Sequence, residues 1–544
     1  MSHLSGWWRT ATACLLSVAC GLAATGDQRL IDAVKNNDLP AVRALIAQGL
    51  NVNASEADGS VALHWAAQRD NLEVADVLIA AGAKVTSATR YNITPLWFAC
   101  KNGDAVLIEH LLKAGADANE AEEEGQTPLM TASLTGKLDA VKVLLAGGAK
   151  VNVTEPYKGE TALMWAAAEG NAKAADLLIE FGADVKAKSR AGFTPLLFAV
   201  RNGELDAVKV LLQHGANAND VAPDRTTALN MAVVNAYFEL ASVLLDHGAN
   251  PNAPDPRGSA LHTIAWLRKP GSDGAVSSGN TPHAPPVPTG EMSGIELARL
   301  LLEHGAKPNI RVDWKENTFT KDGGTARNPP DIHLGRHLLS YIGATPFYVA
   351  AKNGDASYMK LLAEHGADPK IPTKAGITPL MVAAGLDYWE GESPGPFTGV
   401  TEAERLDAVK LAVALGSDIN AHADFGDYPM VGDASYTLLY YPLNMNDLLD
   451  KGVGDPRWSG STPLIGAVVS GQPAIVQYLI DRGAELTAKT KLGWTPLMVA
   501  DGVFFANGKK VFPQAAAIIR KTMAERGLIA AGSNSRANEP VASR

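Results

Sequence analysis

Residues 192–215, GFTPLLFAVRNG followed by ELDAVKVLLQHG, contain the complete folding unit of this chain. The Thr194 side chain can cap a helix, and Pro195 suits its first turn because that N–H has no partner inside a helix. Gly203 ends this first helix, and Gly215 supplies a left-handed stop after a second one. The second helix is predicted from an apolar stripe at helical spacing, Leu205, Val208, Leu211 and Leu212. The stretch therefore predicts two short antiparallel helices joined by a tight turn.

The glycine that closes this unit recurs at intervals of 33 or 34 residues. The recurring positions are Gly49, Gly82, Gly115, Gly148, Gly182, Gly215 and Gly248. A fixed period of this length is typical of one supersecondary unit stacked many times, with each unit packed only on its neighbours. The sequence predicts an all-α solenoid, in which an Asn/Asp-rich linker after each second helix forms a turn or hairpin finger.

The unit resembles the ankyrin repeat, whose signature is Thr-Pro-Leu-His-x-Ala-Ala followed by Leu-Leu-x-x-Gly-Ala. Ala62-Leu63-His64-Trp65-Ala66-Ala67 keeps the signature histidine, and so does Ala260-Leu261-His262. The resemblance covers about residues 27–527 and implies about twelve helix-turn-helix repeats with short hairpin fingers, the first being an N-terminal cap. First helices are expected to begin near residues 62, 95, 128, 162, 195, 228, 260, 346, 379, 463 and 496.

The regular spacing ends at Gly248, after which the intervals are 57, 61, 50, 67 and 44 residues. We therefore divide the chain into a signal peptide (1–24), regular repeats (27–258), repeats with inserts (259–527) and a disordered tail (528–544). Four long inserts are expected at about 269–293, 313–342, 387–402 and 422–458, with a smaller loop near Phe504–Phe512. The first insert is rich in Pro, Gly and Ser and is expected to be mobile.

Aromatic residues are concentrated in the other inserts, and long insertions in solenoids often lie on the binding face. Tyr and Trp frequently anchor interfaces. The candidate partner-binding residues of the inserts are Trp314, Trp389, Tyr436, Tyr440, Tyr441 and Trp458. The alternative is that these rings pack the inserts against the helices and bind nothing.

The ankyrin resemblance also implies a protein-binding concave face, made by the fingers and the exposed ends of the first helices. By position, its candidates are Gln68, Arg69, Lys101, Asn102, Arg201, Asn202, Lys352 and Asn353. Trp65, Phe98, Trp165 and Phe198 would lie beneath them, or belong to the core. The three asparagines precede glycines, so they could instead terminate their helices.

Histidines allow one further alternative, a small-ligand or metal site. His64 and His262 occupy the structural signature position, and four others precede Gly-Ala where an imidazole can satisfy terminal carbonyls: His214, His247, His304 and His365. Asp331, His333 and His337 would form a metal site if their segment were helical. An enzyme or ligand site built by the inserts would gather His333, His337, Trp389, Tyr436 and Tyr440 around one cavity.

Motifs for catalysis are absent from the sequence: it has no H-E-x-x-H, paired C-x-x-C or G-x-S-x-G. Cys100 follows a core alanine and is interpreted as a buried apolar residue. We therefore expect a protein that is not an enzyme and needs no cofactor. The net charge of −10 with interspersed signs argues against nucleic acid as a partner.

Residues 11–24, ATACLLSVACGLAA, are uncharged, too short to span a bilayer and typical of a secretory signal. No other apolar run is long enough to cross a membrane. The stretch Leu16-Ser17-Val18-Ala19-Cys20 approximates a bacterial lipid-attachment box, which would place a lipid anchor at Cys20 as a variant of export. The sequence predicts an exported protein of the periplasm or cell envelope that binds a protein partner. A secreted effector that acts on host proteins is the alternative with the same architecture.

Overall fold

The computed structural model describes residues 26–253, 258–268, 288–312, 342–386, 400–424, 459–502, 504–505, 508–509 and 511–529. The chain divides into two compact units, Met1–Asp184 and Val185–Arg544, each described by itself. Within the described residues, no helix is long and apolar enough to cross a membrane.

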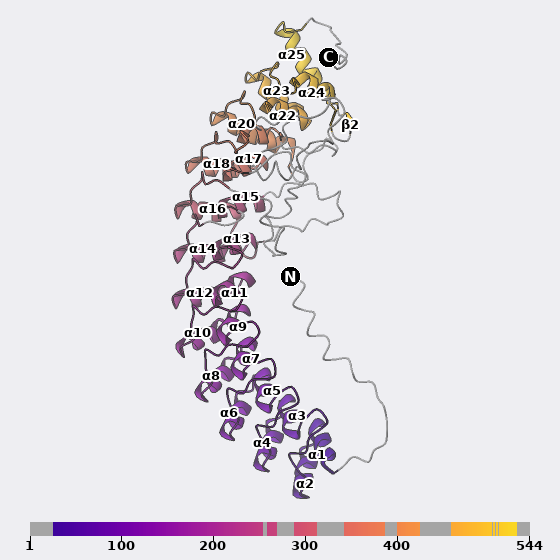
Figure 1. Cartoon of the computed structure of the whole chain (residues 1–544), viewed down its shortest axis with the longest axis vertical. Helices are drawn as coiled ribbons and strands as arrows, with labels where there is room; N and C mark the ends of the chain where they lie inside the picture. Colours follow the sequence, from indigo (N-terminus) through magenta and orange to yellow (C-terminus); the bar gives the residue numbers. More distant parts are fainter. Residues whose placement is uncertain are drawn as a thin grey trace, which may run out of the picture. The chain divides into compact units, whose positions relative to one another are not determined.

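Unit 1 consists of helix pairs, in which the first helices form one row and the second helices form another (Figure 1). The first helices are α1 (Gly26–Lys35), α3 (Ala62–Gln68), α5 (Pro95–Asn102), α7 (Pro128–Thr135) and α9 (Ala162–Ala168). The second helices are α2 (Leu39–Ala47), α4 (Leu72–Ala80), α6 (Ala105–Lys113), α8 (Leu138–Ala146) and α10 (Ala172–Glu180). The core lies between the two rows, where Leu63, Leu78 and Leu107 are fully buried.

Unit 2 repeats the same arrangement. Its first helices are α11 (Pro195–Asn202), α13 (Ala228–Val234), α15 (Ala260–Arg268), α17 (Pro346–Lys352), α19 (Pro379–Ala383), α22 (Pro463–Val469) and α24 (Pro496–Gly502). Its second helices are α12 (Leu205–Gln213), α14 (Phe238–Asp246), α16 (Gly294–Glu303), α18 (Ala356–Glu364), α20 (Glu402–Ala414), α23 (Pro473–Asp481) and α25 (Pro513–Glu525).

The predicted all-α solenoid and the predicted helix starts are confirmed, and the local chemistry is the expected one. The Thr194 hydroxyl accepts from the Leu197 N–H at 3.3 Å, and Pro195 is the first residue of α11. Gly203 ends α11 with φ +83°, a left-handed conformation that costs little only for glycine. Isolated bridges such as Ser55 with Val61 confirm the short hairpin fingers.

Neighbouring repeats are joined by an asparagine in the turn after the second helix. In unit 1, Asn119 Nδ2 donates to the Gly148 carbonyl at 3.1 Å, and its Oδ1 accepts from the Lys150 N–H at 2.7 Å. In unit 2, Asn309 makes the same two bonds, to the Gly366 carbonyl (2.9 Å) and from the Asp368 N–H (2.8 Å). The second clamp keeps this geometry although its partners are 57 and 59 residues away in the sequence.

The fingers show where two of the long insertions enter the chain. In a plain finger a backbone N–H donates to the carbonyl four residues later, as from Ala222 to Thr226 at 2.8 Å. The corresponding bond runs from Val312 to Ala344 at 3.0 Å, a separation of 32 residues and thus an excess of 28. A second runs from Ala423 to Ser461 at 2.9 Å, a separation of 38 residues and an excess of 34. The hairpin hydrogen bond is therefore retained at the base of both insertions.

One short strand pair lies at the smaller loop near the C-terminus. β1 (Phe504–Phe505) pairs antiparallel with β2 (Gly508–Lys509), with Phe504 opposite Lys509. We had expected a loop without structure of its own there. The Asn507-Gly508 dipeptide is a hairpin turn signal that the prediction of a plain loop overlooked.

Candidate functional site

The first helices of unit 1 present half-buried aromatic rings fixed by polar contacts. Trp65 Nε1 donates to Glu56 Oε2 at 2.7 Å. Lys35 Nζ lies 2.6 Å from Glu56 Oε1 and 4.1 Å from the centre of the Trp65 ring. The ring is therefore held between a finger carboxylate and an ammonium group, an arrangement that favours cation–π attraction.

The next repeat continues this pattern with a different set of residues. The Trp97 and Phe98 rings meet edge to face, with centroids 5.2 Å apart. Lys101 Nζ lies 5.3 Å from the Trp97 centroid, and the Lys101 side chain is exposed. Together with Gln68, Arg69 and Trp165, these side chains make up what we call the first-helix face of unit 1: Lys35, Trp65, Gln68, Arg69, Trp97, Phe98, Lys101 and Trp165.

The signature histidines are structural, as predicted. His64 Nδ1 accepts from the Val61 N–H at 3.0 Å, and its Nε2 donates to the Ile93 carbonyl of the next finger at 3.0 Å. In unit 2, His262 Nε2 donates to the Ala344 carbonyl at 3.1 Å. Burial lowers the pKa of His64, and it lowers the pKa of His262 to about 4, so both imidazoles are neutral at physiological pH.

Other sequence-based interpretations of single residues are also tested by the structure. His247 and His365 each place Nδ1 on the carbonyl four residues earlier, at 2.8 and 2.9 Å. Cys100 is fully buried, and burial raises the pKa of its thiol. Phe198 is only 7% exposed, so it belongs to the core rather than to a contact surface.

Five of the predicted concave-face residues are exposed to solvent: Gln68, Arg69, Lys101, Arg201 and Asn202. Asn102 is half-buried, and its Nδ2 donates to the Ala67 carbonyl at the end of α3 at 2.9 Å. This bond joins one repeat to the previous one, so Asn102 has a structural role. Arg201 stacks over Phe193 and Phe198, at 5.4 and 5.2 Å from their centroids.

Lys352 and Asn353 correct the sequence-based expectation, because both lie in the interior of unit 2. Lys352 is 5% exposed and its Nζ lies 5.6 Å from the centre of the buried Trp266 ring. Asn353 is 2% exposed and donates to the Ala265 carbonyl at 3.0 Å. The repeat before them places a tryptophan where unit 1 has Gln68, and this ring helps to bury the lysine.

A buried ion pair beside these residues was missed by sequence reasoning. Arg268 Nε lies 2.8 Å from Asp355 Oδ2, and the Asp355 side chain is 2% exposed. Burial acts to raise the pKa of Asp355, but hydrogen bonds from Arg268 and Ser357 outweigh it, and the pKa is lowered. The pairing joins positions 87 residues apart, so no local pattern could have indicated it.

The insert residues proposed as contacts lie outside the described residues: Trp314, Trp389, Tyr436, Tyr440, Tyr441 and Trp458. The same holds for the metal alternative of Asp331, His333 and His337, and for Cys20. Across the described part of the chain, no group of three or more His, Cys, Asp or Glu side chains could hold a metal ion.

Comparisons with known proteins place this geometry in one family. The family profile described as "Ankyrin repeats (3 copies)" matches residues 13–89, 30–121, 96–189 and 163–255, and the single "Ankyrin repeat" profile matches 342–374 and 459–491. Among solved structures, the chain is similar to the human ASB11 ankyrin repeat domain, with 29% identity over 41% of this chain and 98% of that one, and a TM-score of 0.38. No curated protein matches. The family profiles cover more than half of the sequence, and the chain belongs to the ankyrin-repeat family.

Proposed function

We propose that the protein is a non-catalytic scaffold that binds another protein through the first-helix face of unit 1. The observation that carries this proposal is the series of half-buried aromatic rings with cations stacked on them, Lys35 on Trp65 and Lys101 on Trp97. Rigid aromatic groups of this kind lose little conformational entropy on binding and often dominate interface energetics.

The exposed cations of this face indicate the chemistry of the partner. Arg69 and Lys101 are exposed at the ends of α3 and α5. A partner surface that combines apolar side chains with Asp or Glu would bury the rings and pair with these cations. The two finger insertions would add further contacts, since both leave unit 2 from finger tips, after Val312 and after Ala423.

The test begins with affinity capture of the partner and continues with its measured affinity for single variants. Trp65→Ala is expected to weaken binding by about thirtyfold, as a hot-spot truncation of about 2 kcal/mol does. Lys101→Ala is expected to weaken it several-fold. The matched control is Lys113→Ala, which removes an exposed lysine from the second helix of the same repeat.

The proposal fails if Trp65→Ala and Lys101→Ala bind the partner as tightly as the wild type while circular dichroism shows native helix content. A Lys113→Ala variant that loses as much affinity as Lys101→Ala would move the binding surface to the second helices. Deleting residues 313–341 and 425–458 tests the contribution of the finger insertions separately.

Export belongs to this proposal as well. It is supported by the uncharged stretch 11–24, and the lipid anchor by the cysteine at position 20. Cell fractionation, with a Cys20→Ser variant that should leave the membrane fraction if Cys20 is lipidated, tests both. Recovery of the wild type from the host cytosol would favour the secreted effector instead.

A further inference from the structure

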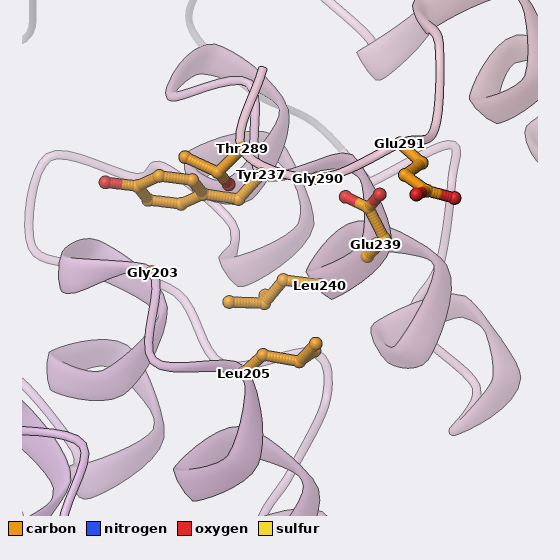
Figure 2. A pocket seen from close by; sticks show the side chains of 8 residues that line it. All are labelled: Gly203, Leu205, Tyr237, Glu239, Leu240, Thr289, Gly290 and Glu291. Carbon is orange, nitrogen blue, oxygen red and sulfur yellow. The ribbon is translucent and has the colours of Figure 1, made fainter. Parts of the chain in front are cut away.

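A pocket lies on unit 2 at the turns that join first and second helices. We call it the turn-side pocket; its volume is about 340 Å³ and its lining residues are Gly203, Leu205, Tyr237, Glu239, Leu240, Thr289, Gly290 and Glu291 (Figure 2). Gly203 ends α11, and Tyr237 is the residue before α14. Residues 289–291 come from the segment just before α16, which a plain repeat does not have. The pocket therefore exists because this segment lies against the turns of the two preceding repeats.

The segment is held in place by a defined contact. The Met292 N–H donates to Glu239 Oε1 at 2.7 Å. Gly290 has φ +109°, and a Cβ at this position would overlap the Glu239 carboxylate. Only glycine allows the backbone to come so close to that side chain. The position of the Glu239 carboxylate beside residues 290–292 is thus a specific feature of the fold.

The lining separates apolar and acidic groups. Figure 2 shows the Glu239 and Glu291 carboxylates at the same end of the pocket, with the Tyr237 ring at the other and Leu205 and Leu240 along one side. Tyr237 is 7% exposed, and its ring packs where a Cβ of Gly203 would lie, 2.8 Å away. The lining residues include no cation. A ligand with an apolar body and a positive end is complementary to this arrangement.

Neither carboxylate is neutralised by the described part of the chain. Among the described residues, Glu239 and Glu291 form no ion pair with Lys, Arg or His. The pKa of Tyr237 is raised by burial and by the nearby Glu204 carboxylate, which shows that the negative potential extends to the aromatic end. An anionic ligand is therefore disfavoured throughout the pocket.

We propose that the turn-side pocket binds a guanidinium or ammonium group on an apolar stem, the chemistry shared by arginine and lysine side chains and by free alkyl cations. The stem would pack on Leu205, Leu240 and the Tyr237 ring, and the cation would meet Glu239 and Glu291. A guanidinium matches two carboxylates especially well because its N–H groups form a planar fork. The volume equals that of roughly ten water molecules, enough for such a side chain.

Ligand-observed NMR titration at low ionic strength tests this with Nα-acetyl-arginine methylamide. Its neutral isostere, the citrulline methylamide, has the same shape without the charge. The wild type should bind the arginine probe at least tenfold more tightly than the citrulline probe. Glu239→Gln and Glu291→Gln should each weaken binding of the arginine probe about tenfold.

Neither substitution should unfold the repeat. The Glu239→Gln variant retains an acceptor oxygen for the Met292 N–H. Glu291 is exposed, and among the described residues its carboxylate has no ion-pair partner to lose. Circular dichroism of both variants should therefore show the native helix content.

The matched control is Glu73→Gln, since Glu73 is the second residue of α4 just as Glu239 is the second residue of α14. This variant should bind the probe like the wild type. Equal binding of the arginine and citrulline probes, or unchanged binding by both pocket variants, overturns the proposal. Butylguanidine distinguishes the sources: weaker binding than the arginine probe assigns the site to a polypeptide side chain, and tighter binding assigns it to a free cation. Trp65→Ala should not alter any of these affinities, so this site and the first-helix face can fail independently.

Discussion

The same four residues, Lys-Asn-Gly-Asp, occur at 101–104 in unit 1 and at 352–355 in unit 2. They make the same local contacts: the asparagine donates to a carbonyl of the preceding first helix, and the aspartate caps the following second helix. Their surroundings differ. Lys101 is exposed, whereas Lys352 is 5% exposed. The difference comes from the preceding repeat, not from the sequence of the turn.

The charges next to the two aspartates differ in the same way. Asp70 stands before Asp104, and burial and the Asp104 carboxylate raise the pKa of Asp70. At the aligned position of unit 2 is Arg268, which pairs with Asp355. The repeat geometry therefore brings the end of one first helix to the cap of the next second helix, and the residue types decide whether that contact repels or attracts.

Removal of the aspartate should separate the two turns most strongly. Asp355→Ala leaves Arg268 largely buried without its carboxylate and also removes a helix cap, at a cost of about 3 kcal/mol in the free energy of unfolding. Asp104→Ala loses a cap but relieves repulsion with Asp70, and should cost about 1 kcal/mol or less. Urea denaturation followed by circular dichroism measures both. Equal losses would mean that the Arg268 pair adds nothing to the cap.

Acid should weaken unit 2 through His262. Its folded pKa of about 4 lies below the ordinary histidine value of 6.5, so the unfolded chain binds the proton more readily. Stability is then lost as the pH falls from about 6.5 towards 4, by about 2 kcal/mol between pH 7 and pH 5. His262→Gln should flatten this part of the pH profile of the unfolding free energy. An unchanged slope in this variant would exclude His262 as the source.

The asparagine clamps should contribute equally in the two units. Asn119→Ala and Asn309→Ala each remove two hydrogen bonds at exposed sites, and we expect a loss of about 1 kcal/mol for each. Thermal denaturation of both variants gives the comparison. A much smaller loss for Asn309→Ala would show that repeats separated by a long insertion depend on other contacts.

The smallest expected effect is a gain in stability from Asp70→Asn at pH 7. The substitution removes the repulsion with Asp104, and asparagine tolerates the positive φ of 57° at this position. Because the site is exposed and screened by solvent, the gain should be a few tenths of a kcal/mol. As the folded pKa of Asp70 is raised, the gain should disappear at acidic pH, where the native carboxyl is protonated. A gain that persists there would have a cause other than charge.

Period and capping residues were sufficient to predict the fold. Thr and Pro set the helix starts and Gly the ends, because these effects act within a few residues. The exposure of Lys352 was predicted wrongly by analogy with Lys101, since Trp266 and Arg268 act on it from 86 and 84 residues away in the sequence. The turn-side pocket was equally inaccessible to sequence reasoning, because it depends on where residues 289–291 lie against Glu239 and Tyr237.

The central comparison is tested most directly by the acylation rates of the lysine side chains, measured by mass spectrometry on the folded protein. Lys101 and Lys352 lie in identical tetrapeptides, so differences in local sequence are excluded. We expect Lys101 to react at a rate close to that of Lys113, whose side chain is 68% exposed, and Lys352 to react at least tenfold more slowly. Equal rates for Lys101 and Lys352 would contradict the conclusion that the plain repeats keep this face open while the repeats of unit 2 bury it.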